Sequence, residues 1–192
     1  MNILVLAPME CEAENFRQAL HKGRTRNHYK VVCCGVGKVE AASCTALEVY
    51  NPHFNVDLVV DIGYAAGSKA FNQGDLVFPD STMFHDVMVP EGFLDHMTKK
   101  FQLQGSDDVI CLTGDSFVDA ELANKLTEKY GENIIFDMEC AAIAQVCQEP
   151  GVPVLQLKII SDIPQRQCLQ DFNEFVQNNT DFTNFVRFLE TI

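Results

Sequence analysis

Basic residues are few in this sequence. Its 192 residues include 14 Lys and Arg against 27 Asp and Glu, which gives a formal net charge of −13 at pH 7. A surface this acidic repels phosphate backbones, so we expect no nucleic-acid partner. The one basic cluster, HKGRTR at residues 21–26, is short and is expected to form an exposed loop between a helix and a strand.

The cysteines and histidines lack the spacings of metal sites and disulfide frameworks. None of the eight cysteines forms a C-x-x-C pair, and the five histidines show neither H-x-H nor H-E-x-x-H spacing. Most cysteines lie in apolar segments, where free cysteine behaves as a small hydrophobic residue. We therefore expect a reducing, cytoplasmic environment, no metal site and no cofactor.

Long apolar runs are missing as well. The run NILVLA at residues 2–7 has no basic segment before it and leads directly into acidic residues, so we expect no signal peptide. No apolar segment has the length needed to cross a bilayer, so we expect no membrane association. Apolar residues nonetheless make up 47% of the chain, which is enough for one globular domain with a substantial core.

Short apolar segments alternate with amphipathic segments along the chain. Strands are expected at residues 2–7, 29–34, 57–62, 75–79, 83–89, 109–113, 134–137 and 154–160. Helices are expected at residues 10–20, 38–50 and 119–130, from Cys140 onward, and in one long C-terminal segment containing Phe172, Phe175, Phe182, Phe185 and Phe188. This alternation predicts a single α/β domain over residues 1–192, with three layers in which helices flank a central mixed, largely parallel sheet.

Polar residues follow directly after most of the predicted strands. Ligands of open α/β sheets bind at the carboxyl ends of the strands, so these residues are the first candidates for a site. They lie at 9–12, 35–38, 63–67, 113–117, 137–139 and 161–162. Among them, Glu139 begins the apolar helix of the segment FDMECAAIAQVC (136–147), where an unpaired carboxylate is costly. A ligand at this edge of the sheet would account for that carboxylate.

Two glycine-rich stretches invite a phosphate-binding interpretation that their details do not support. GVGK at 35–38 fails the P-loop pattern because Val39 stands where Ser or Thr is required. It fails the dinucleotide fingerprint because Glu40 occupies the place of a small residue. GYAAG at 63–67 is expected as a small-residue loop after a central strand, where backbone amides can approach a ligand closely.

The acids have structural interpretations when they are taken singly. Asp162, at the end of a buried strand, suits a helix N-cap or a buried acid with a raised pKa. Glu12 lies in the first turn of a helix, where a carboxylate suits the helix dipole. His85 and Asp86 would point to opposite faces of a strand, so we assign them a structural role. Glu12, Glu139 and Asp162 together, with two glycine-rich loops at the same edge, favour acid–base chemistry on a neutral, hydroxyl-rich substrate.

Seven landmarks, in order along nearly the whole chain, resemble the nucleoside phosphorylase/nucleosidase superfamily. Within it, the sequence is most similar to the 5'-methylthioadenosine/S-adenosylhomocysteine nucleosidases. The landmarks are APMECE (7–12), CGVGKVEAA (34–42), DIGYAAG (61–67), GDLVFPDSTMFHD (74–86), TGDSFV (113–118), DMECAAIAQVC (137–147) and KIISD (158–162). Each is a weak pattern alone, but their order and spacing are quite specific. The resemblance implies hydrolysis of the N-glycosidic bond of a purine nucleoside, with release of the free base.

The resemblance also implies roles for individual residues. Glu12 would position and activate the attacking water, and Asp162 would protonate the purine at N7. Glu139 would bind the ribose hydroxyls, and Phe117 would stack on the purine. The remaining substrate contacts that the resemblance implies involve Met9, Val36, Gly63, Val118, Met138 and Ser161.

The nucleophile is expected to be water. Phosphorylases of the superfamily place arginines near the first and third loops, whereas here the first loop carries Glu10 and Glu12 and the third, 63–67, has no Arg. A purine nucleoside phosphorylase, a futalosine-type hydrolase and a non-catalytic nucleoside-binding module remain alternatives.

Three features depart from the nucleosidase pattern. Tyr64 stands where the nucleosidases usually have Ser, and Lys158 stands where they usually have Arg. The chain is also shorter than typical members, mostly between His85 and Thr113, a region that usually helps to form the 5' side of the site and the subunit interface. Cleavage of the N-glycosidic bond is therefore a firmer expectation than specificity for a 5'-thio group. A homodimer is expected from the resemblance and from the frequency of dimers among enzymes.

Overall fold

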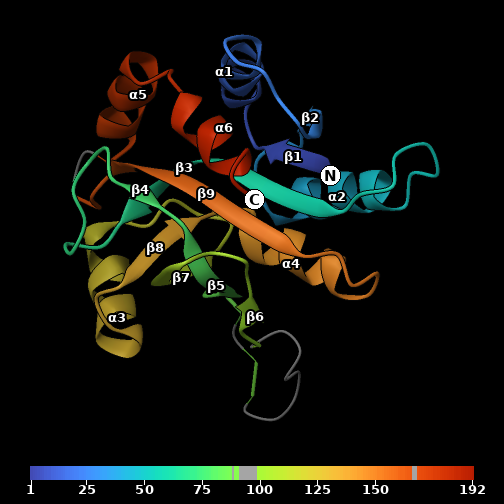
Figure 1. The fold of residues 1–192 in the computed structure, drawn as a ribbon. Helices are drawn as coiled ribbons and strands as arrows, with labels where there is room; N and C mark the ends of the chain where they lie inside the picture. Colours follow the sequence, from blue (N-terminus) through green and yellow to red (C-terminus); the bar gives the residue numbers. More distant parts are fainter. Residues whose placement is uncertain (88, 91–98, 166–167) are drawn as a thin grey trace.

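Apolar strands with both faces covered build one mixed sheet. A computed structural model of the chain describes residues 1–87, 89–90, 99–165 and 168–192 (Figure 1). The sheet has nine strands in the order β2-β1-β3-β8-β7-β5-β6, and β9 pairs with β3 and β4. The strands are β1 (Asn2–Ala7), β2 (His28–Cys33), β3 (Leu58–Gly67), β4 (Leu76–Val77), β5 (Pro79–Phe84), β6 (Phe101–Gln102), β7 (Asp107–Thr113), β8 (Ile134–Asp137) and β9 (Val154–Asp162).

The pairing confirms the predicted mixed, largely parallel sheet. β1 pairs in parallel with β2 and β3, β3 with β9, and β7 with both β5 and β8. The antiparallel pairs are β3 with β8, β4 with β9, and β5 with β6. Because most long strands run in the same direction, their carboxyl ends meet at a common edge.

Helices cover both faces of the sheet (Figure 1). They are α1 (Glu10–His21), α2 (Lys38–Val49), α3 (Ala120–Tyr130), α4 (Cys140–Gln148), α5 (Cys168–Asn178) and α6 (Thr183–Leu189). On one face, Phe16 of α1, Phe182 at the N-cap of α6 and Phe185 within α6 pack in one core with β1, β3 and β9. On the other face α2 and α4 share a second core, and α3 packs over β7 and β8. The apolar helix that begins at Cys140 is buried, as its composition predicted.

The stretch GYAAG was predicted to be a loop, and this was wrong. Residues 63–67 continue β3, which is ten residues long. The reason is tertiary: β9 pairs with β3 from Val59 to Ala66, with one irregularity between Ala65 and Ala66. The backbone hydrogen bonds between β3 and the long, buried strand β9 override the weak strand preference of small residues.

The C-terminal helix was predicted to be continuous, and this was also wrong. It is divided into α5 and α6. The intervening residues are poor helix formers, and the carboxylate of Asp181 accepts a hydrogen bond from the backbone N–H of Thr183 at 3.0 Å. The strand expected at 83–89 also lies earlier, at Pro79–Phe84, and Met88 is outside the described residues.

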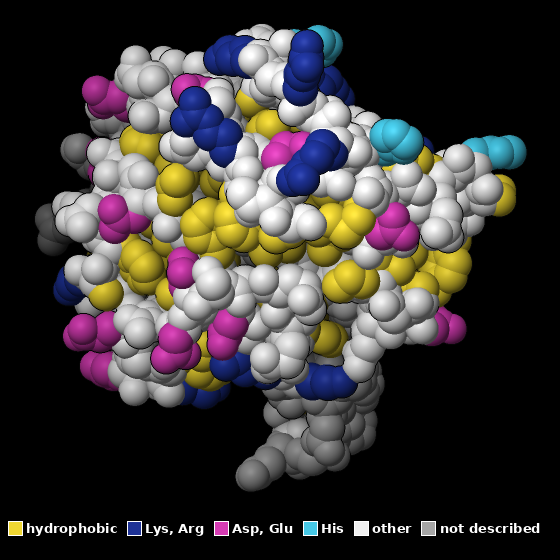
Figure 2. Space-filling model, viewed as in Figure 1, with side chains coloured by type: hydrophobic (Ala, Val, Ile, Leu, Met, Phe, Trp, Pro, Cys, Tyr) yellow, Lys and Arg dark blue, Asp and Glu magenta, His cyan; other side chains and the backbone are white. Residues whose placement is uncertain are grey.

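The surface reflects the charge balance of the sequence. In the view of Figure 2, several Lys and Arg side chains lie near α1 and others lie along the lower side of the molecule, where acidic side chains accompany them. The seven cysteines whose side chains are described are all free. No helix in the described parts of the chain combines the length and the apolar character needed to cross a membrane.

Candidate active site

A cavity of about 260 Å³ lies at the edge where the parallel strands end. Segments that follow β1, β2, β7 and β8 contribute to it, together with the second half of β3 and the end of β9. Every site residue predicted from the sequence lines this cavity except Gly63. The full lining is Pro8, Met9, Glu12, Val36, Tyr64, Ala65, Ala66, Ser116, Phe117, Val118, Phe136, Asp137, Met138, Glu139, Ser161, Asp162 and Phe172.

Glu12 is held at the wall of the cavity by two backbone amides. Its side chain accepts a hydrogen bond from the N–H of Met9 at 2.8 Å and from that of Tyr64 at 3.0 Å. Glu12 is 1% exposed, and burial raises its pKa to about 7 despite the opposing effect of Lys158. A carboxyl group with a pKa near neutrality is suited to accept a proton from water.

Gly63 does not line the cavity, but it makes room for Glu12. Its φ is +142°, and a Cβ added there would lie 2.4 Å from Oε1 of Glu12. A side chain at position 63 would therefore displace the carboxylate. Gly63 thus acts on the site through Glu12, which corrects its expected place as a direct substrate contact.

Glu139 lies at the start of α4, beneath the glycine turn that follows β2. Its Oε1 accepts a hydrogen bond from the N–H of Gly37 at 2.8 Å. Burial, followed by the charge of Asp137, raises the pKa of Glu139 to about 8. Burial and the charge of Asp137 therefore disfavour the anionic form of Glu139. Positive charge developing on a bound sugar would favour its ionisation.

Asp162 ends β9 and caps no helix. Its Oδ1 lies 2.6 Å from Oγ of Ser161, which in turn lies 3.1 Å from the carbonyl oxygen of Ala65. The serine hydroxyl has one proton, so both contacts are full hydrogen bonds only when Asp162 itself carries a proton. Burial raises the pKa of Asp162, against the lowering effect of the Ser161 hydrogen bond. Both observations suit a proton donor.

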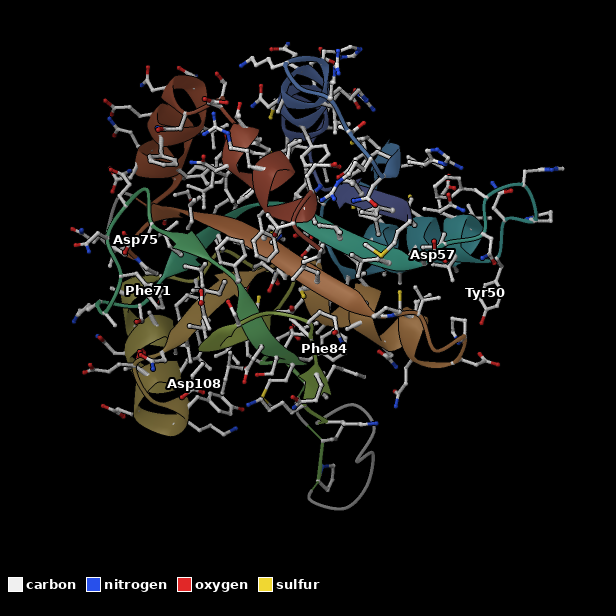
Figure 3. All side chains as sticks on the ribbon, in the orientation of Figure 1. Tyr50, Asp57, Phe71, Asp75, Phe84 and Asp108 are labelled. Atoms are coloured by element: carbon white, nitrogen blue, oxygen red, sulfur yellow. The ribbon has the colours of Figure 1, made fainter. Side chains whose placement is uncertain are left out.

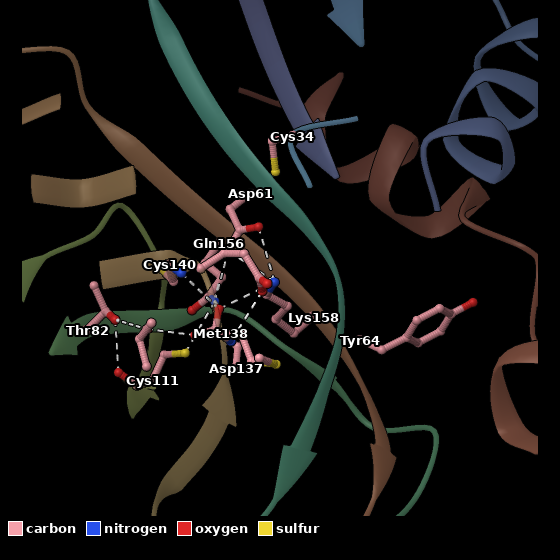
Figure 4. A network of polar contacts seen from close by, with 12 residues as sticks. Cys34, Asp61, Tyr64, Thr82, Cys111, Asp137, Met138, Cys140, Gln156 and Lys158 are labelled. Carbon is pink, nitrogen blue, oxygen red and sulfur yellow. Dashed lines mark hydrogen bonds and ion pairs between the residues drawn. The ribbon is translucent and has the colours of Figure 1, made fainter. Parts of the chain in front are cut away.

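A buried ionic network of Lys158, Asp61, Asp137 and Gln156 lies next to these acids (Figure 4). Nζ of Lys158 lies 3.1 Å from the carboxylate of Asp61 and 3.5 Å from that of Asp137, and all three side chains are at most 1% exposed. Gln156 donates to the same two carboxylates, at 3.1 and 2.8 Å. Burial alone would lower the pKa of Lys158, but the surrounding carboxylates raise it well above its ordinary value. Lys158 therefore stays charged.

The network also fixes the start of α4. Asp137 accepts hydrogen bonds from the hydroxyl of Thr113 at 2.6 Å and from the N–H of Cys140 at 3.1 Å. The Thr113 hydroxyl oxygen accepts a further bond from the N–H of Ala141 at 3.0 Å. The neighbouring Glu139 is thereby held at the cavity.

One cluster in the described residues has ligand atoms close enough together for a metal ion: Cys111, Asp137 and Cys140. Both oxygens of Asp137 already accept hydrogen bonds, and the ammonium of Lys158 lies 3.5 Å from it. A cation at this position would be repelled by Lys158, so the cluster is better understood as part of the polar network.

Ion pairs join the loops at the rim of the cavity. Nζ of Lys38 lies 2.6 Å from Asp86 and 3.5 Å from Asp115. The N–H of Asp115 donates to Asp86 at 3.0 Å. His85 and Asp86 follow β5 instead of lying on a strand, and Asp86 has the structural role that was predicted for it.

Sequence reasoning missed the network and three lining residues outside the candidate segments, Pro8, Phe136 and Phe172. Asp61 and Lys158 interrupt otherwise apolar strands, and a charged residue inside such a segment was an available signal of a buried pair. Phe172 was assigned to core packing because of its spacing along a helix. It does pack against the core, and it also lines the cavity, with its ring centroid 5.9 Å from that of Phe117.

Comparison with known proteins identifies the family of the chain. The family model of the phosphorylase superfamily matches residues 4–106 and 106–187. A 5'-methylthioadenosine/S-adenosylhomocysteine nucleosidase of Bacillus thuringiensis subsp. konkukian (strain 97-27) is 29% identical over 97% of this chain and 96% of its own. The nucleosidase of the same name from Baumannia cicadellinicola is 30% identical over 75% of this chain and 72% of its own.

Solved structures share the fold. An S-adenosylhomocysteine nucleosidase from Streptococcus pyogenes, in complex with 5-methylthiotubericidin, has a TM-score of 0.86 at 22% identity, covering 100% of this chain and 97% of its own. A futalosine hydrolase mutant of Helicobacter pylori has a TM-score of 0.83 at 21% identity, with the same coverage. The structural likeness establishes the architecture, and the family model matches nearly the whole sequence. The protein therefore belongs to the phosphorylase superfamily.

Proposed function

We propose that the protein hydrolyses the N-glycosidic bond of a purine nucleoside, with 5'-methylthioadenosine and S-adenosylhomocysteine as the foremost substrates. The observation that carries this proposal is the convergence of Glu12, Glu139 and Asp162 on one cavity. The nucleosidase names of the sequence relatives support it independently.

The reaction assigns one task to each acid. Glu12 accepts a proton from water, and the water oxygen forms a bond to C1' of the ribose. The C1'–N9 bond breaks with its electron pair going to the purine, and Asp162 transfers its proton to N7, so the base leaves neutral. Positive charge grows on the ribose in an oxocarbenium-like transition state, which carboxylates nearby stabilise. Glu139 binds the ribose hydroxyls.

The other lining residues would hold the substrate. Phe117 is 53% exposed at the mouth of the cavity, which leaves its ring free to stack on the purine, and the backbone of Val118 would bond the edge of the base. Ser161 supports Asp162. Met138 packs against the sugar, and Met9 and Val36 line the sugar and the 5' region.

The cavity favours water over phosphate as the nucleophile. None of the described lining residues is Arg or Lys, and four of them are buried acids. A phosphate dianion would meet no compensating charge and would be repelled. This distinguishes hydrolysis from the phosphorolysis that other members of the superfamily carry out.

Chromatography of free bases tests the proposal. The purified protein is incubated with methylthioadenosine, adenosylhomocysteine, adenosine, inosine or futalosine, with and without phosphate. We expect adenine to be released without phosphate, fastest from the two 5'-thio substrates. Release that requires phosphate would make the protein a phosphorylase, and binding of adenine without turnover would make it a binding module. A preparation of the Asp162→Asn variant controls for contaminating nucleosidases.

We also propose that the protein is a homodimer that pairs through α2 and α4. Val39, Leu47 and Tyr50 on α2 and at its end are 74%, 77% and 57% exposed, which is unusual for large apolar side chains. Figure 3 shows Tyr50 at the periphery of the molecule. A shallow groove beside them runs between α2 and α4, with Ala42, Ala46 and Val146 among its lining residues.

We propose a cytoplasmic location as well, because the described cysteines are free. Cell fractionation would test it.

Light scattering after size exclusion tests the dimer. We expect a mass of twice the 21.5 kDa of the chain, and we expect Leu47→Glu to shift it toward the monomer. Leu169, which is 55% exposed on α5, provides the matched control Leu169→Glu, which should remain dimeric. A monomeric wild-type protein, or dissociation by both variants alike, would contradict this interface.

A further inference from the structure

Tyr64 connects the catalytic edge of the sheet to the C-terminal helices. Its backbone N–H donates to Oε1 of Glu12 at 3.0 Å. Its side chain is 7% exposed and points away from the buried ionic network, toward α5 and α6 (Figure 4). Tyr64 therefore contacts both Glu12, the proposed base, and the helices α5 and α6.

The hydroxyl of Tyr64 anchors the junction between α5 and α6. It donates a hydrogen bond to the carbonyl oxygen of Asn179, the residue directly after α5. Asn179 is itself fixed to the last turn of α5, because its backbone N–H and its side-chain amide donate to the carbonyl of Phe175, at 3.0 and 2.9 Å. The anchor therefore holds the end of α5.

The ring of Tyr64 is the centre of an aromatic cluster. The ring centroids of Phe172, Phe175 and Phe182 lie 6.3, 6.0 and 5.6 Å from it, in edge-to-face arrangements. Phe172 lines the cavity and meets Phe117 edge-to-face, with ring centroids 5.9 Å apart. A chain of ring contacts thus runs from Tyr64 through Phe172 to the ring proposed to stack on the purine.

We propose that Tyr64 is a positioning residue that sets substrate affinity by holding α5, and with it Phe172, against Phe117. The proposal rests on the proposed nucleosidase function. When α5 is docked, Phe172 completes an apolar wall of the cavity. When the hydroxyl anchor is lost, a smaller fraction of molecules has this wall in place. The apparent affinity for substrate falls in proportion to that fraction. The catalytic acids are not displaced, because the backbone bond from Tyr64 to Glu12 does not depend on the side chain.

The variant Tyr64→Phe removes only the hydroxyl and tests the proposal. A hydrogen bond of ordinary net strength corresponds to a factor of about three to ten, so we expect KM to rise by about that factor. We expect kcat to stay within about twofold, because Glu12 and Asp162 keep their positions. Hydrogen exchange of peptides from residues 168–192 should be faster in the variant.

Tyr29→Phe is the matched control. Tyr29, on β2, also binds the C-terminal segment, through a hydrogen bond from its hydroxyl to Oε1 of Glu190 at 2.6 Å, but it does not line the cavity. We expect this variant to be less stable, with KM unchanged. An equal rise of KM in both variants would mean general loosening of the C-terminal segment and would overturn the proposal. An unchanged KM for Tyr64→Phe, with wild-type hydrogen exchange, would also overturn it.

The result also distinguishes this proposal from the proposed function. If the wild-type protein releases no base from any nucleoside, the function fails. The exchange measurement still tests the anchor in that case, because it requires no substrate. If the wild-type protein is active and Tyr64→Phe matches it in KM and in exchange, only the role of Tyr64 fails.

Discussion

Replacing Asp162 by Asn is expected to lower the rate of base release by about 10²- to 10⁴-fold, the usual contribution of a general acid. An amide has nearly the same shape as a carboxyl group but has no proton to transfer at neutral pH. The purine would then have to leave as an anion. Initial rates with methylthioadenosine, measured over a wide range of enzyme concentration, determine the loss.

The fold should survive this substitution. Oγ of Ser161 lies 2.6 Å from Oδ1 of Asp162, and the NH2 group of an asparagine can donate to that hydroxyl as a protonated carboxyl does, so Ser161 can still donate to the carbonyl oxygen of Ala65. Burial raises the pKa of Asp162, so these surroundings disfavour a charge at this position, and a neutral amide suits them. We therefore expect thermal unfolding close to that of the wild type.

Asp108→Asn is the control, because it makes the same chemical change at an exposed position. Asp108 is exposed on β7 (Figure 3), so the change should alter neither rate nor stability. If Asp162→Asn retained a rate near that of the wild type, another group would have to protonate the base, and Asp162 would return to a structural role.

The site was largely predictable because its parts follow a local rule. Asp162 ends a strand, Glu139 begins the helix after a strand and Glu12 lies in the first turn of the helix after another, and a parallel sheet brings such positions to one edge. Alternation of apolar strands and helices was sufficient to predict that sheet. The three acids could therefore be grouped before any distance was known.

What could not be predicted depends on partners distant in the sequence. GYAAG has a turn-like composition, and only its pairing with β9, about 95 residues later in the chain, makes it a strand. The charges of Asp61 and Lys158 were visible within apolar segments, but the sequence does not show that they face each other across β3 and β9. The break between α5 and α6 had a local signal, the run Asn-Asn-Thr-Asp at 178–181, which the regular spacing of the phenylalanines obscured.

Lys158→Met is expected to destabilise the folded protein by about 3–5 kcal/mol, the usual cost of leaving a buried charge without its partner. Methionine keeps the length and most of the volume of the lysine stem, so the loss would report the charge and not a cavity. Lys158 lies between Asp61 and Asp137 with no exposed surface, and without it both carboxylates remain buried. Urea denaturation monitored by circular dichroism measures the difference.

Lys125→Met is the surface counterpart. Lys125 forms an exposed pair with Glu121 at 2.7 Å on α3, and solvent screening leaves such a pair with little effect on stability. A loss of similar size for Lys158→Met would show that the buried carboxylates take up protons at almost no cost, and the electrostatic account of the network would be wrong.

The pH dependence separates this account from one based on packing. In Lys158→Met the carboxylate of Asp61 loses its cation, so its pKa in the folded state, which burial already raises to about 6, rises further above the unfolded value of about 4. Between those two values the folded state binds more protons than the unfolded state, so stability falls as pH rises. The loss of stability relative to the wild type should therefore be largest at pH 8 and should shrink toward pH 5.

A loss of stability caused by lost packing would not depend on pH in this way, and adding Asp61→Asn would not reduce it. In the electrostatic account the second substitution removes one uncompensated charge, so the double variant should be more stable than Lys158→Met alone at pH 8.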